Sequence, residues 1–252
     1  MPSSDQTDQV IPGYDPDDYP RVAVTVDIVV FTIVDDDLRV LLVQRGEPPF
    51  LGRWALPGGF VRPDENLDRA AVRELAEETG IHQKVGLLEQ FGSYGDPGRD
   101  PRMRVVTVGY WAIVPDLPSP RGGSDARHAE MVSVAEVESE RMRLAFDHQH
   151  IFSEALETAR SSLEDRTVGT LFCEPGFKVS TLRQVYNTVW NTDLDAGNFQ
   201  RKVTTADGFL TKLKSAPVRS GERGGRPASL WTAGTAKKLS PPISRPLDDV
   251  EE

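Results

Sequence analysis

The sequence predicts an α+β fold in two parts: a strand-rich first part that contains one acidic helix, and a smaller, basic and mostly helical second part. Three observations lead to this prediction. Runs of β-branched residues flank a single helix pattern between residues 22 and 114. Two short amphipathic helix patterns follow one another between residues 178 and 206, and two alternating segments come after them. Charge is also unevenly distributed along the chain, because residues 178–238 are basic although the net charge of the whole chain is −10.

The length and composition are those of a soluble globular protein. The 252 residues suffice for one large or two modest domains with an ample core. No apolar run reaches the about 18 residues of a membrane helix and no signal-peptide pattern opens the chain, so we expect a cytoplasmic protein without a membrane partner. Cys173 is the only cysteine, which excludes an intramolecular disulfide and a zinc site made of several cysteines. Residues 1–20 and 239–252 resemble disordered tails, since they are rich in acidic residues and proline.

The first two predicted strands pair with each other. Residues 22–34, VAVTVDIVVFTIV, and 39–45, RVLLVQR, are rich in β-branched side chains, and the turn-like sequence at 35–37 separates them. Two more strands are expected at 85–94 and 104–114. The segment between these later strands, GDPGRDPRMR, has too much Gly and Pro for a strand or helix and is predicted as a loop.

A helix is predicted over residues 67–79, which lack Gly and Pro and are rich in Leu, Ala, Arg and Glu. Asn66 or Asp64 caps its start, and Gly80 suits its end. One stripe is apolar, because apolar residues recur at a spacing of four. The residues of this stripe are Leu67, Ala71 and Leu75.

The opposite face of this helix is a candidate metal site. Glu74, Glu77 and Glu78 lie at positions i, i+3 and i+4, and three carboxylates so close together repel one another unless a cation lies among them. Mg²⁺ prefers such hard oxygen ligands. The preceding Gly58-Gly59 lets backbone approach the metal, with the Gly58 carbonyl as a further ligand. The alternative is a solvated acidic helix face. The metal site is favoured because the glycines, Glu65 and Arg73 stand in register, and we expect Glu65 and Arg73 to pair and hold the loop against the helix.

Residues 59–81, GFVRPDENLDRAAVRELAEETGI, resemble the Nudix box at every position. Nine fixed or restricted positions match, which chance would give with a probability on the order of 10⁻⁷. The resemblance implies an α/β/α sandwich with a mixed sheet. It also implies that the protein binds or hydrolyses a nucleoside diphosphate linked to another group, usually with Mg²⁺ or Mn²⁺. If the protein hydrolyses its ligand, Glu74, Glu77 and Glu78 are the catalytic residues, with Glu65 and Arg73 supporting them.

The segments that flank the box supply candidate ligand contacts. RGEPPFLGRWALPGGF resembles the same segment of Nudix sugar-nucleotide proteins, where Arg45 and Trp54 would contact a diphosphate and a base. Trp54 is equally compatible with a place in the core. The loop at 95–104 resembles one that borders the ligand in ADP-ribose-type Nudix domains. Its three arginines would meet phosphate, unless the segment is an ordinary basic surface loop. These arginines are Arg99, Arg102 and Arg104.

The residues after 145 form a segment that is too long for a tail. The segment 147–166 is predicted as a helix that links two parts, and 178–190 as a second helix with Ser180 as its cap. A further short helix is expected at 198–206, followed by an alternating hairpin whose tip is VRSGERGG. Helix, turn, helix and basic hairpin is the order of a winged helix. Apolar residues of the helix at 178–190 form one stripe: Leu182, Val185, Tyr186 and Val189.

Charge supports a polyanion-binding role for this second part. Residues 178–238 contain 11 Lys and Arg against 4 Asp and Glu, a net charge of +7. The second helix of such a fold enters the DNA major groove and the wing contacts phosphate. The alternative is that these cations merely solvate a small surface. The candidate DNA contacts are Asn198, Gln200, Arg201, Lys202 and Thr204 on the helix, with Arg223 and Arg226 in the wing.

The two parts together resemble Nudix-related transcriptional regulators of NAD metabolism, through FKVSTLRQVY, LDAGNFQRKV and GGRPASLW. The resemblance implies a repressor in which the Nudix domain senses ADP-ribose or a related metabolite. The winged helix would bind a palindromic, double-stranded operator upstream of NAD biosynthesis or salvage genes, and ligand would release the DNA. We expect a homodimer, since helix-turn-helix readers usually bind two half-sites. The expected parts are a Nudix domain at 21–145, a linking helix at 146–166 and a winged helix at 167–238.

Enzymatic activity stays open at this point. Many members of that regulator family have a degraded box, whereas the box here is intact, so a Mg²⁺-dependent ADP-ribose pyrophosphatase is the competing hypothesis. Such an enzyme needs a base to activate water. Asp125 and Glu130 lie in a plausible stretch, but neither is identified by the sequence. An RNA-processing Nudix enzyme fits less well, because the basic segment lacks an aromatic stacking platform.

Overall fold

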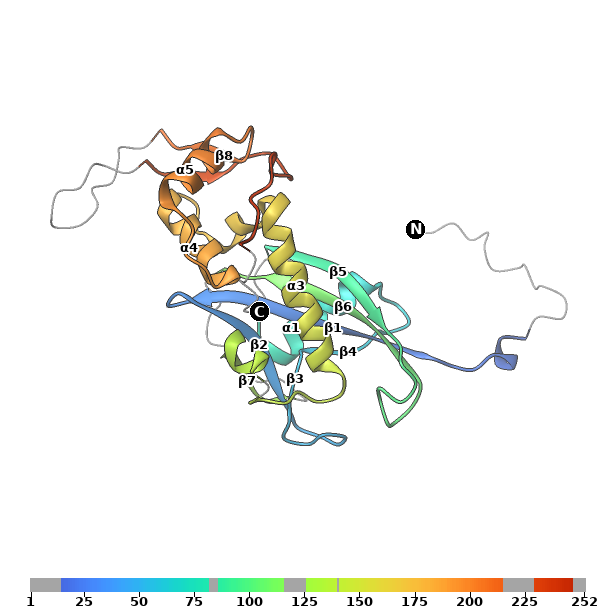
Figure 1. Ribbon diagram of the computed structural model, residues 1–252. Helices are drawn as coiled ribbons and strands as arrows, with labels where there is room; N and C mark the ends of the chain where they lie inside the picture. The colour runs from blue at the N-terminus through green and yellow to red at the C-terminus, as the bar shows by residue number, and fades with distance from the viewer. Residues whose placement is uncertain (1–14, 82–85, 116–125, 140, 215–228, 247–252) are drawn as a thin grey trace, which may run out of the picture.

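A computed structural model describes residues 15–81, 86–115, 126–139, 141–214 and 229–246. It confirms an α+β fold in which a mixed sheet carries helices on both faces and a helical module lies at one end (Figure 1). Within the described residues, no helix is long and apolar enough to cross a membrane. The N-terminal residues 1–14 lie outside the described ranges, and a short 3-10 helix occupies Pro16–Asp18.

The sheet has seven strands, and its central path runs β3-β2-β1-β6-β5. The long strand β1 pairs in parallel with β6 and antiparallel with β2, which makes the sheet mixed. The turn between β1 and β2 is tight, with positive φ angles at Asp35 and Asp36. Strands β4 and β7 pair with β1 and β2, outside the main path. The strands are β1 Ala23–Val34, β2 Asp37–Arg45, β3 Trp54–Ala55, β4 Gly58–Phe60, β5 Leu87–Tyr94, β6 Val105–Ile113 and β7 Ala126–Ser133.

The four strands predicted from the sequence are confirmed, and three others were not predicted. Strand β7 reads ARHAEMVS, which lacks the β-branched run by which a strand is recognised. Strands β3 and β4 contain only 2 and 3 residues. A short helix, α2 (Val134–Glu138), follows β7 and was not predicted either.

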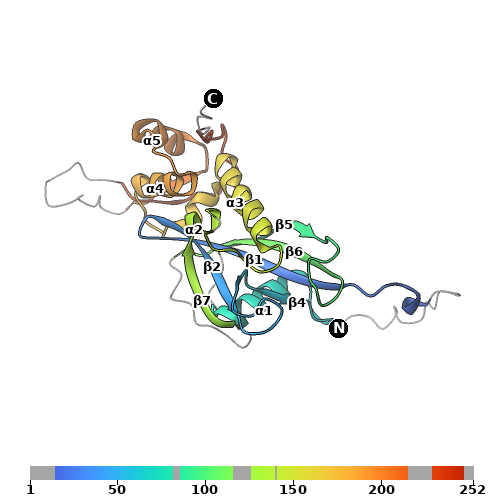
Figure 2. The ribbon, with the colours of Figure 1, turned by 60° about the horizontal axis from the view of Figure 1, so that its bottom comes forward.

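The two faces of the sheet bury two separate apolar clusters. Along β1, Val29 and Phe31 face one cluster, whereas Val26, Ile28 and Val30 face the other. This division follows from the alternation of side chains along a strand. Helix α1 (Leu67–Thr79) covers the second cluster and α3 (His148–Asp165) the first, on opposite sides of the sheet (Figure 2).

Helix α1 occupies the residues that the sequence predicted. The Asn66 side chain accepts a hydrogen bond from the Arg69 amide and caps the start. Gly80 ends the helix at φ 70°, a conformation that suits glycine. Ala71 and Leu75 of the predicted stripe are buried, and Leu67 packs against the same cluster.

The C-terminal module contains the predicted helix, helix and hairpin. Its elements are η2 Thr167–Phe172, α4 Val179–Trp190, α5 Ala196–Thr205, β8 Leu210–Lys212 and β9 Trp231–Ala233. The four residues predicted for the apolar stripe of α4 are all buried. Ser180 is not the cap, because the helix begins at Val179 and Lys178 occupies the cap position. Residues 215–228, which include the wing tip, lie outside the described ranges.

The module and the sheet share one apolar cluster. It includes Phe31 and Trp111 of the sheet, Phe152 of α3, and Tyr186 and Phe199 of the module. Helix α3 packs on the sheet and also against α4 and η2. It therefore does more than link two parts, since its buried face belongs to both.

The prediction of a disordered tail over 239–252 is wrong for residues 239–246. Leu239 and Ile243 are buried, at 3% and 8% exposure, in the cluster around α3. Their backbone amides donate to the carbonyls of Asp165 and Glu164 at 2.6 and 2.8 Å, which fixes the segment to the end of α3. The segment is ordered because the burial of these two apolar side chains offsets the loss of conformational entropy of a short stretch of chain. Residues 247–252 lie outside the described ranges.

Candidate functional site

Arg73 organises the acidic face of α1. Its Nε donates to Glu65 Oε2 at 2.9 Å, which confirms the predicted pairing, and its Nη2 donates to the Phe60 carbonyl at 3.0 Å. Its Nη1 reaches Glu74 at 2.6 Å and Glu77 at 3.1 Å. Hydrogen bonding to Arg73 lowers the pKa of Glu65 to about 2. One guanidinium thus ties the loop before α1 to two carboxylates of the helix.

The two glycines before the box clear space for backbone and carboxylate. A Cβ on Gly59 would lie 2.5 Å from Glu74 Oε1, and a Cβ on Gly58 would lie 2.2 Å from the Val26 carbonyl oxygen. The Gly58 amide donates to Glu78 Oε2 at 2.9 Å. Any larger residue at these two positions would therefore push the loop off β1 and α1.

The acidic face fits a divalent cation in donor type and in charge, but it is not assembled as a closed metal site. Among the described residues, no group of three or more His, Cys, Asp or Glu side chains is gathered as a metal site would be. Arg62 and Arg73 contact three of the carboxylates. The four carboxylates of this face carry two more charges than these two guanidiniums, and one Mg²⁺ or Mn²⁺ would balance that difference. Burial raises the pKa of Glu74, an effect that a nearby cation would oppose. The four are Glu65, Glu74, Glu77 and Glu78.

A pocket lies beside this face, between β1, β2, the box loop and the start of α3. Glu78 is the one member of the acidic triad that lines it. Three predicted ligand contacts also line it, together with aromatic and acidic side chains. Its principal charged and aromatic residues are Asp27, Arg45, Phe60, Glu78, Arg99, Asp100, Arg102, Phe146 and His148.

The arginines of the pocket differ in how strongly they are already engaged. Arg45 donates to the Pro49 carbonyl at 2.7 Å and its guanidinium lies 4.8 Å from the Phe146 ring centre. Burial, and secondly the nearby Arg102, lower the pKa of Arg45, so this end of the pocket favours an anion. Arg102 pairs with Asp100 at 2.7 Å and lies over the Phe60 ring at 5.5 Å.

Arg99 is the most deeply engaged of the three. Its side chain is only 5% exposed, and Nη2 contacts Asp27 at 3.2 Å and Asp147 at 2.6 Å. A second bond joins Nε to Asp147 at 2.8 Å. Arg99 therefore holds the loop at 95–104 against β1 and the start of α3, and two carboxylates already compensate its charge.

Sequence reasoning missed two pocket residues at the start of α3. His148 is buried; its Nδ1 accepts from the Leu56 amide at 2.9 Å, and its Nε2 lies 3.6 Å from Asp27. Burial lowers the pKa of His148, which favours the neutral ring with its proton on Nε2. The Phe146 ring lies 5.2 Å from that of His148. The segment DHQH is the only signal in the sequence, and it does not reveal a partner 92 residues away.

Three further predicted residues, each in the described part of the chain, lie outside this pocket lining. Trp54 packs beside the core with His128 at a ring distance of 6.0 Å, and Arg104 donates to the Val105 carbonyl at 3.3 Å. Glu130 is exposed on β7. Asp125 lies outside the described residues.

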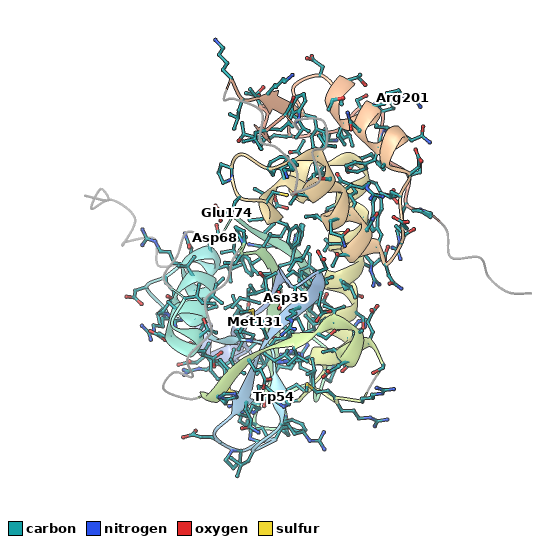
Figure 3. All side chains as sticks on the ribbon, turned by 90° about the vertical axis from the view of Figure 1, so that its left-hand side faces the viewer. Asp35, Trp54, Asp68, Met131, Glu174 and Arg201 are labelled. Carbon is teal, nitrogen blue, oxygen red and sulfur yellow. The ribbon has the colours of Figure 1, made fainter. Side chains whose placement is uncertain are left out.

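The predicted DNA-reading helix, α5, presents Asn198, Gln200 and Arg201 to solvent. Arg201 donates to Asn198 at 3.1 Å, and it lies at the opposite end of the molecule from Trp54 (Figure 3). Lys202 and Thr204 were predicted to be exposed and are half-buried. Lys202 donates to the Pro242 carbonyl, and Thr204 to the Gln200 carbonyl at 2.7 Å. The ordered segment at 239–246 thus covers one edge of α5. Arg223 and Arg226 lie outside the described residues.

Comparison with known proteins covers both parts of the chain. The NUDIX domain family matches residues 24–155. An ADPR-responsive transcriptional repressor, NtrR, of Acinetobacter baylyi is 31% identical over 220 residues, which are 86% of this chain and 84% of the repressor. The crystal structure of Shewanella oneidensis NrtR with a 27mer DNA is 31% identical. It covers 88% of this chain and 99% of that one, at a TM-score of 0.72. The NUDIX domain of the same NrtR with ADP ribose covers 58% and 94%, at 37% identity and a TM-score of 0.53.

Proposed function

This chain belongs to the family of Nudix-domain transcriptional repressors that respond to ADP-ribose, and we propose that it binds an operator through α5 and its wing and leaves it when the pocket fills. The observation that carries this function is the likeness to a DNA-bound repressor, which extends through the sheet, α3 and the C-terminal module together. A hydrolase alone would need only the first part. The basic module at the far end of α3 is what a DNA reader requires.

The ligand we propose for the pocket is ADP-ribose or a closely related NAD metabolite. Arg45 and Arg102 face the same pocket and suit a diphosphate, since guanidinium groups bind phosphate through paired hydrogen bonds. The Phe60 and Phe146 rings lie beneath these guanidiniums and offer apolar faces to the rest of the ligand. Trp54 and Arg104, which the sequence also suggested as ligand contacts, do not line this pocket, so the proposal does not use them.

A divalent cation would be held by Glu74, Glu77 and Glu78, with the Gly58 carbonyl as a further oxygen donor. When bound, Mg²⁺ or Mn²⁺ would neutralise the diphosphate and, in an enzyme, activate water. Of the three glutamates, Glu78 is the one that we expect to contact a cation bound beside the ligand, because it lines the pocket. Arg73 keeps Glu74 and Glu77 in place on the helix beside it.

For DNA we propose that Asn198, Gln200 and Arg201 read base edges in the major groove, since they are exposed on α5. Thr204, Lys202 and the wing residues Arg223 and Arg226 would contact the phosphate backbone. The reader would act as a two-fold homodimer on a palindromic operator near genes of NAD biosynthesis or salvage. These events take place in the cytoplasm.

Hydrolysis of ADP-ribose is the second candidate function. The observation that favours it is the complete acidic face, in which Gly59 leaves room for Glu74 and Arg73 orders the carboxylates. Incubation of the protein with ADP-ribose and Mg²⁺, followed by chromatography for AMP and ribose phosphate, tests it. Product formation that depends on Glu78 would make the protein an enzyme as well as a regulator.

The repressor function is tested by fluorescence anisotropy with genomic fragments at physiological salt. We expect one fragment to bind at least about 10³-fold more tightly than random DNA, as specific readers do. Addition of ADP-ribose should weaken that binding by about 5- to 150-fold, the range of an ordinary allosteric coupling. If no fragment exceeds random DNA, the repressor function is wrong and the hydrolase remains.

A further inference from the structure

The start of α3 is built into the ligand pocket. Phe146 and His148 line it, and the Leu56 amide donates to His148 Nδ1 at 2.9 Å. The Ala145 amide donates to the Trp54 carbonyl at 2.7 Å, which fixes the turn before the helix to β3. Whatever fills the pocket therefore lies against the turn before α3 and the first residue of the helix.

The other end of α3 is fixed to the DNA-reading module. The Trp190 indole of α4 donates to the Arg160 carbonyl at 2.9 Å, and Arg160 Nε donates to the Val189 carbonyl at 3.2 Å. The segment at 239–246 adds bonds to the last turn of α3 and also contacts Lys202 of α5. With 18 residues, α3 is about 27 Å long. Figure 1 shows this one helix running from beside the sheet to the C-terminal module.

The Arg99–Asp147 pair is the charged contact between the pocket loop and this helix. Asp147 occupies the cap position of α3 without a capping hydrogen bond of its own, so its carboxylate is committed to Arg99. The side chain of Asp27 is 7% exposed and that of Asp147 is 25% exposed, so Asp147 is the carboxylate that can more readily move into solvent. Besides Asp27 and Arg99, the charged side chains of the pocket lining are Arg45, Arg102, Glu47, Glu78 and Asp100.

A diphosphate in this pocket would compete with Asp147. Arg99 carries one positive charge and already faces two carboxylates, so an incoming anion meets a local excess of negative charge. The ligand gains Arg99 as a partner only if one carboxylate moves away. Because Asp147 is the more exposed carboxylate and caps α3, its departure would remove the charged contact that holds the start of that helix against the pocket loop.

We propose that the Arg99–Asp147 ion pair is the latch that holds α3 in the DNA-binding arrangement, and that the ligand's diphosphate opens it. This inference rests on the proposed function, because it assigns the regulation of the same pocket. The linkage is reciprocal: a latch that favours DNA binding must weaken ligand binding by the same factor. Arg99 is thus a positioning residue as well as a ligand contact.

Asp147→Asn and Asp147→Ser test the latch. Both residues suit a helix cap position, so α3 keeps its start, whereas the charge that binds Arg99 is lost. The matched control is Asp165→Asn, which makes the same chemical change at the exposed last residue of α3. For each full-length variant, calorimetry measures ADP-ribose affinity, and anisotropy measures operator affinity with and without saturating ADP-ribose.

The latch predicts tighter ADP-ribose binding, weaker operator binding and a loss of coupling in both Asp147 variants. The ratio of operator affinities without and with ADP-ribose should fall from the wild-type value, about 5- to 150-fold, to within about twofold of one. Asp165→Asn should keep the wild-type ratio. A wild-type ratio in the Asp147 variants, or an equal loss in Asp165→Asn, would overturn the latch.

Failure of the proposed function would look different from failure of the latch. If wild-type protein binds no operator or shows no response to ADP-ribose, the repressor function fails before the variants are compared. If wild-type protein responds and the Asp147 variants respond equally, only the latch fails. Thermal unfolding of each variant checks that the fold is intact, and Asp147→Ser supplies the answer should Asp147→Asn keep a neutral hydrogen bond to Arg99.

Discussion

The loop between β5 and β6 places two neighbouring arginines in different surroundings, which makes a matched pair of variants possible. Arg102 lines the pocket and lies over the Phe60 ring. Arg104 is exposed and donates only to backbone carbonyls outside the pocket lining. Arg102→Gln should therefore weaken ADP-ribose binding, whereas Arg104→Gln should leave it almost unchanged.

The expected magnitude follows from the contact that is lost. A hydrogen bond to a charged group contributes about 1.5–3 kcal/mol, which corresponds to about 10- to 150-fold in Kd. The Arg102 side chain is 43% exposed, so solvent screening favours the lower end, near 10-fold. Asp100 is buried and loses its partner in this variant, which adds repulsion of the ligand. The double variant Asp100→Asn/Arg102→Gln removes that repulsion and should recover part of the loss.

Isothermal calorimetry with ADP-ribose measures all three variants against wild type. An ordering in which Arg102→Gln is weakest and Arg104→Gln equals wild type supports the pocket as the diphosphate site. Equal effects of both single variants would show that the loop attracts the ligand only through its overall charge. No effect of either would refute the placement of the diphosphate.

Four other variants examine separate parts of the account. Glu78→Gln removes a charge from the pocket side of α1, so calorimetry should show weaker Mg²⁺ binding, and an unchanged affinity would refute the metal site. Arg201→Ala should weaken operator binding roughly tenfold or more in anisotropy and leave ADP-ribose affinity intact, as loss of a base contact does. Tyr186→Phe removes a buried hydroxyl that has no hydrogen-bond partner among the described residues, so the free energy of unfolding in urea should stay equal or rise by up to about 1–3 kcal/mol. A hydrogen bond from Arg73 lowers the pKa of Glu65 from 4.5 to about 2. Glu65 therefore stabilises the fold fully above pH 4.5, and this contribution is lost as the pH falls through about 2. Glu65→Gln should flatten the pH dependence of the free energy of unfolding between these two values.

The helix of the acidic face was predictable to the residue because its determinants are local. Asn66 caps it and Gly80 ends it, and both residues carry the signal for that position in the sequence itself. The pairing of Arg73 with Glu65 was predictable for a similar reason, since the two lie eight residues apart along one loop and helix. Local chemistry of this kind needs no knowledge of the rest of the fold.

The pocket could be predicted only in part, because half of it comes from distant segments. His148 meets Leu56 across 92 residues, and Arg99 meets Asp147 across 48. Nothing in the sequence around Phe146 and His148 distinguishes pocket residues from the start of an ordinary helix. For the same reason Arg99 was expected to meet phosphate, and its two carboxylate partners were not foreseen. The ordered segment at 239–246 escaped prediction because only the far end of α3 gives its apolar residues a place to pack.

The central claim is that ADP-ribose binding and operator binding are coupled within this one chain. A titration of the wild-type protein with operator DNA, in the absence and presence of saturating ADP-ribose, measures that coupling directly. We expect operator affinity to fall by about 5- to 150-fold with ADP-ribose. The affinity of the protein for ADP-ribose should fall by the same factor in the presence of operator. Identical operator affinities with and without the ligand would contradict the account.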